Sequence, residues 1–237
     1  MKNIIKYKRD FDYSYTSGAF TTIELLKTRP ELVETVYLHS RVSSPVEIEE
    51  LCEQNGIKTE YNDKVFRRTN QKESTYVLGV FRKYSSSVSL SRPHVVLVNP
   101  SDMGNLGTII RTLAGFDLRN LAIITPAADI WDPKTLRASM GALFHVKFQH
   151  FNSIGEYMEQ FPNHTLYPFM PGGEIELRPD KITRNKCFSL VFGNEAKGLD
   201  DDFRKLGTSI RIPQTELVDS LNLSIAVAVG IYIFMLK

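Results

Sequence analysis

The carboxyl-terminal stretch Ile210–Lys237 reads IRIPQTELVDSLNLSIAVAVGIYIFMLK and decides the fold of the chain. It begins as a predicted strand and ends as a helix that is apolar on all sides, which is typical of a helix buried in a protein core. Ser220, Asn222 and Ser224 place small hydrogen-bonding side chains directly before the apolar run 225–236, where a helix start needs capping and where a ligand can be held. We therefore expect the functional site at this junction.

A membrane anchor is the alternative interpretation of this stretch. The unbroken apolar run is shorter than the roughly 20 residues that a spanning helix needs. Extending it toward the amino terminus brings in Glu216, Asp219 and Asn222, which are costly in lipid. We expect no membrane association.

At 237 residues the chain is long enough for two compact domains. Its two cysteines, Cys52 and Cys187, lie far apart in the sequence, which fits reduced thiols in a cytosolic protein. Neither has the spacing of a metal ligand and the sequence has no Cys/His cluster, so we expect no metal site. The amino terminus lacks an apolar core like that of a signal peptide. A cytoplasmic protein is expected.

The net charge of +2 is too small to argue nucleic-acid binding by itself, but basic residues cluster before residue 85. Such clusters mark either a phosphate-binding face or, more commonly, a solvated surface. They consist of Lys2, Lys6, Lys8, Arg9, Lys64, Arg67, Arg68, Lys72, Arg82 and Lys83.

The first part of the chain alternates short helical and strand patterns and predicts a small α/β unit. One helix carries a capping-box pattern, because Glu47 follows Ser44 by three residues and Pro45 suits the first helical position. A serine-rich stretch, 85–92, suits a linker. The predicted helices are 19–29, 46–56 and 63–71, and the predicted strands are 34–40, 57–61 and 74–84.

Beyond residue 92, apolar strands alternate with helical segments, which predicts a parallel sheet flanked by helices. In such sheets ligands bind beyond the carboxyl ends of the strands, so the loops after Val98, after 191–193 and after Ile212 are candidate sites. The predicted strands are 94–99, 120–125, 145–150, 165–169 and 187–193, and a helix is predicted over 104–116.

The first of these loops reads NPSDMGNLGTIIRT, 99–112. Gly104 and Gly107 allow close backbone approach, and Asn105 is expected to cap the helix that follows. Arg111 lies nearly two turns into that helix and either binds a phosphate or carboxylate or forms a surface ion pair. The dinucleotide-binding GxGxxG order and the GK[ST] sequence of a nucleotide triphosphate loop are both absent.

The second loop, LVFGNEAKGLDD, ends a strand with Gly193, Asn194 and Glu195 and turns through Gly198 into an acidic helix start. A single carboxylate after such a strand is often only a helix cap. The third loop, IPQTELVDSLNLS, is the junction described first. The order and spacing of the three loops after successive strands make them a set.

With these three motifs in order, the chain resembles the SpoU/TrmH family of RNA ribose 2'-O-methyltransferases within the SPOUT superfamily. The resemblance covers 93–237 and includes DPKTLRASMGALFHV, which is similar to the PK..RAS.GA.FH segment of that family. It implies an α/β fold with a carboxyl-terminal trefoil knot, an exception to the rule against threaded chains. Residues 1–84 are similar in size and pattern to an L30e-like RNA-binding domain, with 85–92 as linker and 93–237 as methyltransferase domain.

The resemblance also implies site residues, S-adenosylmethionine as cofactor, and a homodimer in which the carboxyl-terminal helix packs against its mate. The implied catalytic or substrate-orienting residues are Asn105, Arg111, Glu195, Ser220 and Asn222. Those implied for the cofactor are Gly193, Asn194, Ile212, Pro213 and Leu221. Those expected to bind RNA are Lys6, Lys8, Arg9, Arg67, Arg68 and Arg111.

Roles follow from the chemistry of the side chains. A guanidinium is a poor proton acceptor at neutral pH, so we expect Arg111 to bind a phosphate and stabilise developing alkoxide charge. Glu195 is expected to orient Arg111 or Asn105. His94 and His145 are assigned structural roles, because they lie away from the three motifs.

The sequence departs from the family pattern at Ala196, where glycine is common, and at Gln214 and Glu216, where the pattern reads IPM.G. A carboxylate at Glu216 either repels a phosphate or favours the positive sulfonium if it lies beside the cofactor, so no cofactor contact is assigned to it. A catalytically silent RNA-binding protein of the same fold therefore stays open as an alternative. A base-methylating enzyme is disfavoured by the Ser-Leu-Asn sequence. The RNA is ribosomal or transfer RNA, with ribosomal RNA slightly favoured.

Overall fold

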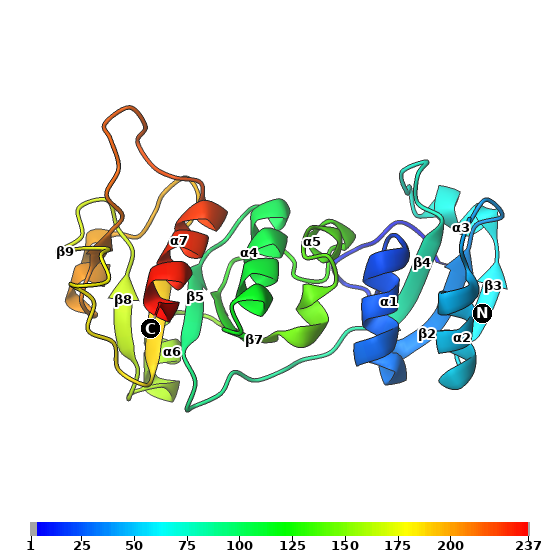
Figure 1. The fold of residues 1–237 in the computed structure, drawn as a ribbon, viewed down its shortest axis with the longest axis horizontal. Coiled ribbons are helices and arrows are strands. Elements are labelled where there is room, and N and C mark those ends of the chain that lie inside the picture. The colour runs from blue at the N-terminus through cyan, green and yellow to red at the C-terminus, as the bar shows by residue number, and fades with distance from the viewer. Residues whose placement is uncertain (1–3, 237) are drawn as a thin grey trace. The chain divides into compact units, whose positions relative to one another are not determined.

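The computed structural model describes residues 4–236, which divide into two compact units (Figure 1). The first unit contains the chain up to Tyr84 together with Asp129–His145. The second contains Ser85–Ala128 and the chain from Val146 onward.

The first unit is built on a four-stranded sheet in the order β1-β4-β2-β3, in which β4 is antiparallel to β1 and β2, and β2 is parallel to β3. The predicted helices and strands are confirmed with small shifts at their ends. β1 was not predicted, because three residues are too few to show a strand pattern. The strands are β1 Tyr13–Tyr15, β2 Val33–Leu38, β3 Lys58–Tyr61 and β4 Val77–Arg82, and the helices are α1 Ala19–Thr28, η1 Pro30–Leu32, α2 Val46–Gln54 and α3 Asp63–Arg68.

The predicted capping box at the start of α2 is wrong. No side chain caps this helix, and Pro45 lies in helical conformation at the N-cap position. The carbonyl of Pro45 accepts hydrogen bonds from the N–H groups of Ile48 and Glu49. The Glu47 carboxylate instead pairs with the Lys27 ammonium of α1 at 2.8 Å, so it is not available to the Ser44 backbone.

The segment Asp129–His145 packs on β1 and β4 of the first unit. The Ser14 hydroxyl donates to the Trp131 carbonyl at 2.6 Å, and the Phe81 ring meets the Trp131 ring edge-on at 5.8 Å. His145 Nε2 lies 2.9 Å from a Glu24 carboxylate oxygen, which agrees with the structural role predicted for this histidine. The segment contains α5 Pro133–Ala138 and η2 Ala142–His145.

The second unit is built on five parallel strands in the order β7-β6-β5-β10-β8, which confirms the predicted parallel sheet. The chain moves outward from β5 to β6 and β7, then crosses to the other side of β5 for β8 and β10. The strands are β5 His94–Val98, β6 Asn120–Ile124, β7 Lys147–Phe151, β8 Thr165–Pro168 and β10 Phe188–Phe192. The strand order therefore reverses between β5 and β10, and ligands of open α/β sheets bind beyond the carboxyl ends at such a point.

The strand predicted to begin at Ile210 is confirmed but lies outside this main sheet. β11, Ile210–Arg211, pairs in parallel with β9, Ile175–Glu176, in a separate two-stranded sheet. Glu176 also accepts a hydrogen bond from the Arg211 guanidinium at 2.7 Å. β9 was not predicted, because two residues show no pattern.

Helices α4, Met103–Gly115, and α7, Leu223–Met235, contact each other on one face of the sheet. α7 lies close to the Phe169 ring at Gly230, where an added Cβ atom would be 2.9 Å from that ring. The expectation that α7 is buried on all sides is wrong for one side, where Ile225 and Tyr232 are each 52 % exposed. Within the described residues, no helix has both the length and the apolar character required to cross a membrane.

The serine-rich stretch that was predicted as a linker lies along the second unit. The Ser86 hydroxyl donates to the Phe148 carbonyl at 2.7 Å, and Val88 is buried in the core of this unit beside Tyr157 and Val191. Tyr157 belongs to α6, Ile154–Gln160, so this helix packs on the same core as strand residues Val96 and Val191.

A buried hydrogen-bonded chain joins this stretch to the sheet. His94 Nε2–H donates to the Ser89 carbonyl at 2.7 Å, and His94 Nδ1 accepts from the Tyr157 hydroxyl at 2.7 Å. The Tyr157 oxygen lies 2.6 Å from the Ser189 hydroxyl, which in turn lies 2.9 Å from His164 Nδ1. The predicted structural role of His94 is confirmed. Burial lowers the pKa of His94 to about 4 and also lowers the pKa of His164.

We predict that this histidine pair makes the fold acid-sensitive. A histidine in the unfolded chain has a pKa of about 6.5, so between about pH 4 and 6.5 the unfolded state binds more protons and stability falls as the pH falls. Urea denaturation should show a lower free energy of unfolding at about pH 5 than at about pH 7.5. His94→Gln should be less stable at the higher pH but lose less on acidification. An equal loss in the variant and the native chain would contradict this account.

Candidate functional site

The Glu195 carboxylate, in the loop after β10, binds the loop after β5. Oε2 accepts hydrogen bonds from the Ser101 N–H at 3.0 Å and the Ser101 hydroxyl at 2.7 Å. Oε1 accepts from the Asp102 N–H at 3.1 Å and from Asn105 Nδ2 at 3.4 Å. Burial raises the pKa of Glu195, but the hydrogen bonds from Ser101 and Asp102 outweigh it, so this pKa lies below its usual value. The group is a carboxylate anion at neutral pH.

Asn105 connects this carboxylate to the start of α7. Its Oδ1 accepts a hydrogen bond from Asn222 Nδ2 at 3.1 Å. Of the three capping candidates Ser220, Asn222 and Ser224, Asn222 is the N-cap of α7. Its Oδ1 accepts from the Ser224 N–H at 2.9 Å and from the Ser224 hydroxyl at 2.7 Å. The first and third motifs, far apart in the sequence, therefore meet at the side chains of Asn105 and Asn222.

The prediction that Asn105 caps α4 is wrong. Asp102 is the N-cap, and its Oδ1 accepts from the Asn105 N–H at 2.7 Å. Asn105 lies in the first turn of the helix, so its side chain is left to bridge Glu195 and Asn222. The Asp three residues before Asn105 is a strong N-cap signal in the sequence that our reasoning missed.

The turn after β10 closes on itself. A Cβ atom at Gly193 would lie 2.2 Å from the Gly198 carbonyl carbon, so no side chain fits at Gly193. Asn194 Oδ1 accepts from the N–H groups of Ala196 and Lys197, and Asn194 Nδ2 donates to the Asn99 carbonyl at 2.8 Å. The backbone at Ala196 is not left-handed, so alanine in place of the usual glycine costs little there.

A cavity of about 380 Å³ lies between this turn and the third loop. Gly193, Asn194, Ile212 and Leu221, expected to hold the cofactor, line it, together with Glu195 and Ser220 of the expected catalytic set. Pro213 is exposed and does not line it. The apolar side chains of the lining suit a flat heterocycle, and its amide, hydroxyl and carboxylate groups suit the ribose and amino-acid parts of S-adenosylmethionine. The residues present therefore fit this cofactor.

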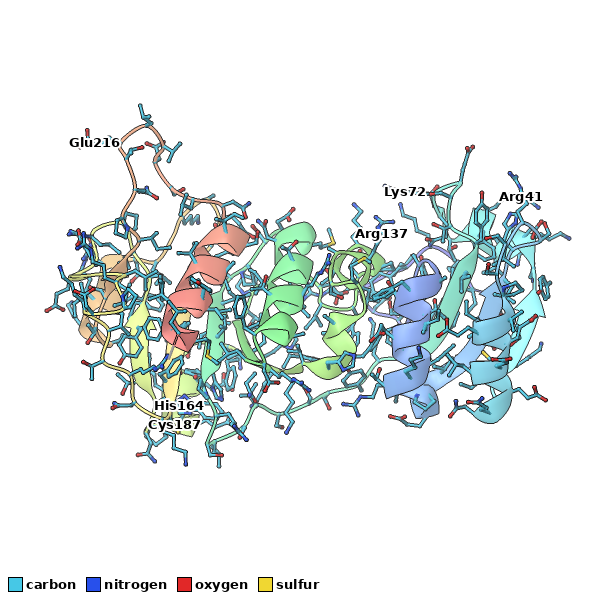
Figure 2. All side chains as sticks on the ribbon, in the orientation of Figure 1. Arg41, Lys72, Arg137, His164, Cys187 and Glu216 are labelled. Atoms are coloured by element: carbon cyan, nitrogen blue, oxygen red, sulfur yellow. The ribbon has the colours of Figure 1, made fainter. Side chains whose placement is uncertain are left out.

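Arg111 and Glu216 lie apart from this cluster. The Arg111 side chain is exposed on α4, and it forms no ion pair or hydrogen bond with other residues in the described part of the chain. The structure joins Glu195 to Asn105 and not to Arg111. Glu216 is exposed on a projecting loop (Figure 2) and does not line the cavity.

The cations expected to bind RNA in the first unit, Lys6, Lys8, Arg9, Arg67 and Arg68, are all exposed. Further cations lie at the end of the sheet where β2 and β3 finish and β4 begins. Here the Ser40 N–H and hydroxyl each donate to the Asp63 carboxylate at 2.8 Å, which ties the loop after β2 to the start of α3. Figure 2 shows Arg41, Lys72 and Arg137 along the same edge of this unit.

Arg41 and Arg137 were not predicted as binding residues. Arg137 belongs to the later part of the sequence, and nothing in the sequence pattern places it in the first unit. Among the residues that the structure describes, no group of three or more histidine, cysteine, aspartate or glutamate side chains is placed to hold a metal ion.

Comparisons with known proteins give one matching family and a set of relatives. The model of the SpoU rRNA Methylase family matches residues 92–232. The 23S rRNA (guanosine(2553)-2'-O)-methyltransferase RlmP of Bacillus subtilis is 24 % identical over 91 % of this chain and 85 % of its own length. An uncharacterized tRNA/rRNA methyltransferase of Synechocystis is 32 % identical over 60 % of this chain, a match that spans about half, 52 %, of that relative.

Solved structures share the fold. The SpoU methyltransferase AviRb from Streptomyces viridochromogenes, in complex with the cofactor AdoMet, matches with a TM-score of 0.81 at 21 % identity, over 94 % of this chain and 90 % of its own. An AdoMet-bound rRNA methyltransferase from Sinorhizobium meliloti matches with a TM-score of 0.78 at 24 % identity, over 94 % of this chain and 86 % of its own.

We predict that two substitutions at Asn222 separate capping from site assembly. Asn222→Ala removes the α7 cap and should lower the free energy of unfolding by about 0.5–2 kcal/mol. Asn222→Asp keeps the capping oxygen and should retain most of that stability, but it has no N–H for Asn105. Both variants should bind S-adenosylmethionine more weakly in calorimetric titration, with stability followed by urea denaturation. An Asp variant as unstable as the Ala variant would contradict the capping role.

Proposed function

Because the chain belongs to the SpoU rRNA Methylase family, we propose that it is an enzyme that methylates a ribose 2'-hydroxyl of RNA with S-adenosylmethionine. The observation that carries this proposal is the convergence of Glu195, Asn105 and Asn222 at the carboxyl ends of β5 and β10, beside a cavity that fits the cofactor. The cofactor supplies a methyl group bound to a positively charged sulfur.

The residues of the chain act mainly by alignment. Displacement at the methyl carbon needs the ribose oxygen in line with the carbon–sulfur bond, and such alignment contributes on the order of 7–11 kcal/mol in the best intramolecular reactions. Glu195 positions Asn105 and the loop after β5. Ser220 and Asn222 hydrogen-bond the ribose. Gly193, Asn194, Ile212 and Leu221 form the cofactor walls, and Pro213 sets the direction of the chain beyond Ile212.

Arg111 binds a phosphate of the RNA and stabilises the developing alkoxide. Its support is that the guanidinium is exposed on α4, beyond Asn105, and forms no ion pair with the described residues. Because a guanidinium stays protonated, the hydroxyl proton leaves to water or to a phosphate oxygen.

The trefoil knot is part of this proposal. One cavity is bordered by residues 169–171, by 192–199, and by residues on both sides of the projecting loop: Ile210, Ile212 and Gln214 before it, and Ser220, Leu221, Leu223 and Ala226 after it. Such convergence is what a carboxyl-terminal segment passed through another loop would produce.

Residues 1–84 form the L30e-like RNA-binding domain of the proposal, with 85–92 as connection and 93–237 as methyltransferase domain. RNA is held by the exposed cations of the first unit, so affinity falls steeply with salt. Ribosomal RNA is favoured, because the match to the ribosomal RNA enzyme of Bacillus subtilis spans 91 % of this chain. The match to a putative tRNA (cytidine(34)-2'-O)-methyltransferase of Listeria innocua spans only 59 %. Unpaired Cys52 and Cys187 agree with a cytoplasmic location.

We predict methyl transfer to one nucleotide. The purified chain is incubated with labelled S-adenosylmethionine and total RNA from cells that lack its gene, and the modified nucleoside is identified and mapped. A single 2'-O-methylated nucleotide is expected. Absence of both transfer and calorimetric cofactor binding would favour the catalytically silent RNA-binding protein.

Arg111 variants provide the internal control for this experiment. With saturating RNA, Arg111→Lys should lower the single-turnover rate, since an ammonium lacks the bidentate geometry, and Arg111→Ala should lower it further. Cofactor affinity should stay unchanged in both. A nearly full rate for Arg111→Lys would remove Arg111 from the proposed chemistry.

We also propose a homodimer through α7. Its support is the apolar pair Ile225 and Tyr232, which are each 52 % exposed in the single chain. They lie nearly two helical turns apart and therefore on the same side of the helix. Light scattering should give the mass of a dimer for the native chain. Ile225→Asp should give a monomer, and Val46→Asp, which changes an equally apolar exposed residue of the first unit, should not. A native monomer at micromolar concentration would contradict the proposal.

A further inference from the structure

A second and larger cavity, of about 630 Å³, lies at the same carboxyl edge of the sheet. It is lined by 98–101 after β5, by 126–128 after β6, and by the turn that follows β10. Its volume is in the range of roughly 300–1,000 Å³ that is typical of small-molecule sites. Its walls do not include Ile212, Ser220 or Leu221, so it is distinct from the cavity assigned to the cofactor.

The two cavities share one wall. Asn194, Lys197, Gly198 and Leu199 line both of them. Ser101 lines the second cavity while its N–H and hydroxyl bind the Glu195 carboxylate, which lines the first. If a ribose is held beside Glu195, the base attached to its C1' carbon can therefore reach the second cavity.

Asn99 lines the second cavity in a left-handed backbone conformation. Its φ is 51°, in a region that asparagine adopts more readily than most other residues with a side chain. Asn99 Nδ2 donates to the carbonyls of Ile124 and Pro126, and the Asn99 carbonyl accepts from Asn194. These bonds fix the amide and leave Oδ1 as an acceptor for a ligand amino or imino group.

The rest of the lining suits a nucleobase. Val98, Ala127, Leu199 and Phe203 provide apolar surface for a flat heterocycle. Lys197 is exposed at this cavity and forms no ion pair with other described residues, so its ammonium is free to meet a phosphate next to the base.

We propose that this second cavity receives the base of the nucleotide whose ribose is methylated, a proposal that rests on the function proposed above. The base is unstacked from its neighbours and enters between the turns after β5, β6 and β10. Asn99 Oδ1 accepts from an amino or imino group of the base, and Lys197 meets its phosphate. Site choice then depends on the base as well as on the RNA contacts of the first unit.

The test fills the cavity without touching the hydrogen bonds of the site. In Ala127→Trp, an indole occupies the space of the base and so displaces the ribose. A displacement of about 1 Å is expected to lower the single-turnover rate of methyl transfer to the mapped RNA about 100-fold. Calorimetric affinity for S-adenosylmethionine should stay within about twofold, and RNA affinity within about threefold, because phosphate contacts dominate it. Ser87→Trp, on exposed surface of the same unit, is the matched control and should change none of these quantities.

A modified substrate makes the test specific. A synthetic RNA that lacks only the base at the mapped nucleotide should be methylated more slowly than the complete RNA by the native chain. Ala127→Trp should methylate the two RNAs at similar rates, because removing the base has no further effect once its pocket is filled. Ala128→Leu, a smaller insertion on the same wall, gives the same comparison if the indole prevents folding.

The outcomes separate this proposal from the one on which it rests. A native chain without methyl transfer to any RNA overturns both. A native chain that methylates RNA, with filled variants equally fast, overturns the base site alone. Loss of cofactor affinity in Ala127→Trp also overturns it, because the cavity would then hold part of the cofactor.

Discussion

The Glu195 carboxylate is the interaction on which the site depends. It accepts hydrogen bonds from Ser101, Asp102 and Asn105, which lie on the loop and helix after β5, more than 80 positions earlier in the sequence. β5 and β10 are neighbours only because the strand order reverses between them. The fold brings the two strand ends together, and the carboxylate fixes the turns that leave them.

The hydrogen bonds that begin at this carboxylate reach both helices that lie on one face of the sheet, α4 and α7. Asp102 and Asn105 belong to the start of α4, and Asn105 in turn contacts Asn222, the cap of α7. A single chain of hydrogen bonds therefore joins all three sequence motifs. The two cavities share the turn after β10, so the proposed cofactor and substrate sites are lined in part by the same few residues.

Much of this arrangement follows from the sequence. The apolar runs predict the five parallel strands, and parallel strands share a carboxyl edge, so the loops after Val98 and Phe192 are expected at the same edge of the sheet. A helix cap among Ser220, Asn222 and Ser224 also follows from their place before the apolar run. What the sequence does not predict depends on contacts distant along the chain: the strand order that makes β5 and β10 neighbours, the bridge made by Asn105, the left-handed Asn99, and the docking of Asp129–His145 on the first unit. β1 and β9 are too short to show a period.

The central claim is that the charge on Glu195 holds the loop after β5 in place, and amide hydrogen exchange in Glu195→Gln tests it most directly. A hydrogen bond to a charged group contributes about 1.5–3 kcal/mol, so the amides of Ser101 and Asp102 should exchange at least about tenfold faster in the variant than in the native chain. Amides within β6 should keep their protection. Unchanged exchange at Ser101 and Asp102 would contradict the account, because the loop would then be held by something other than this carboxylate.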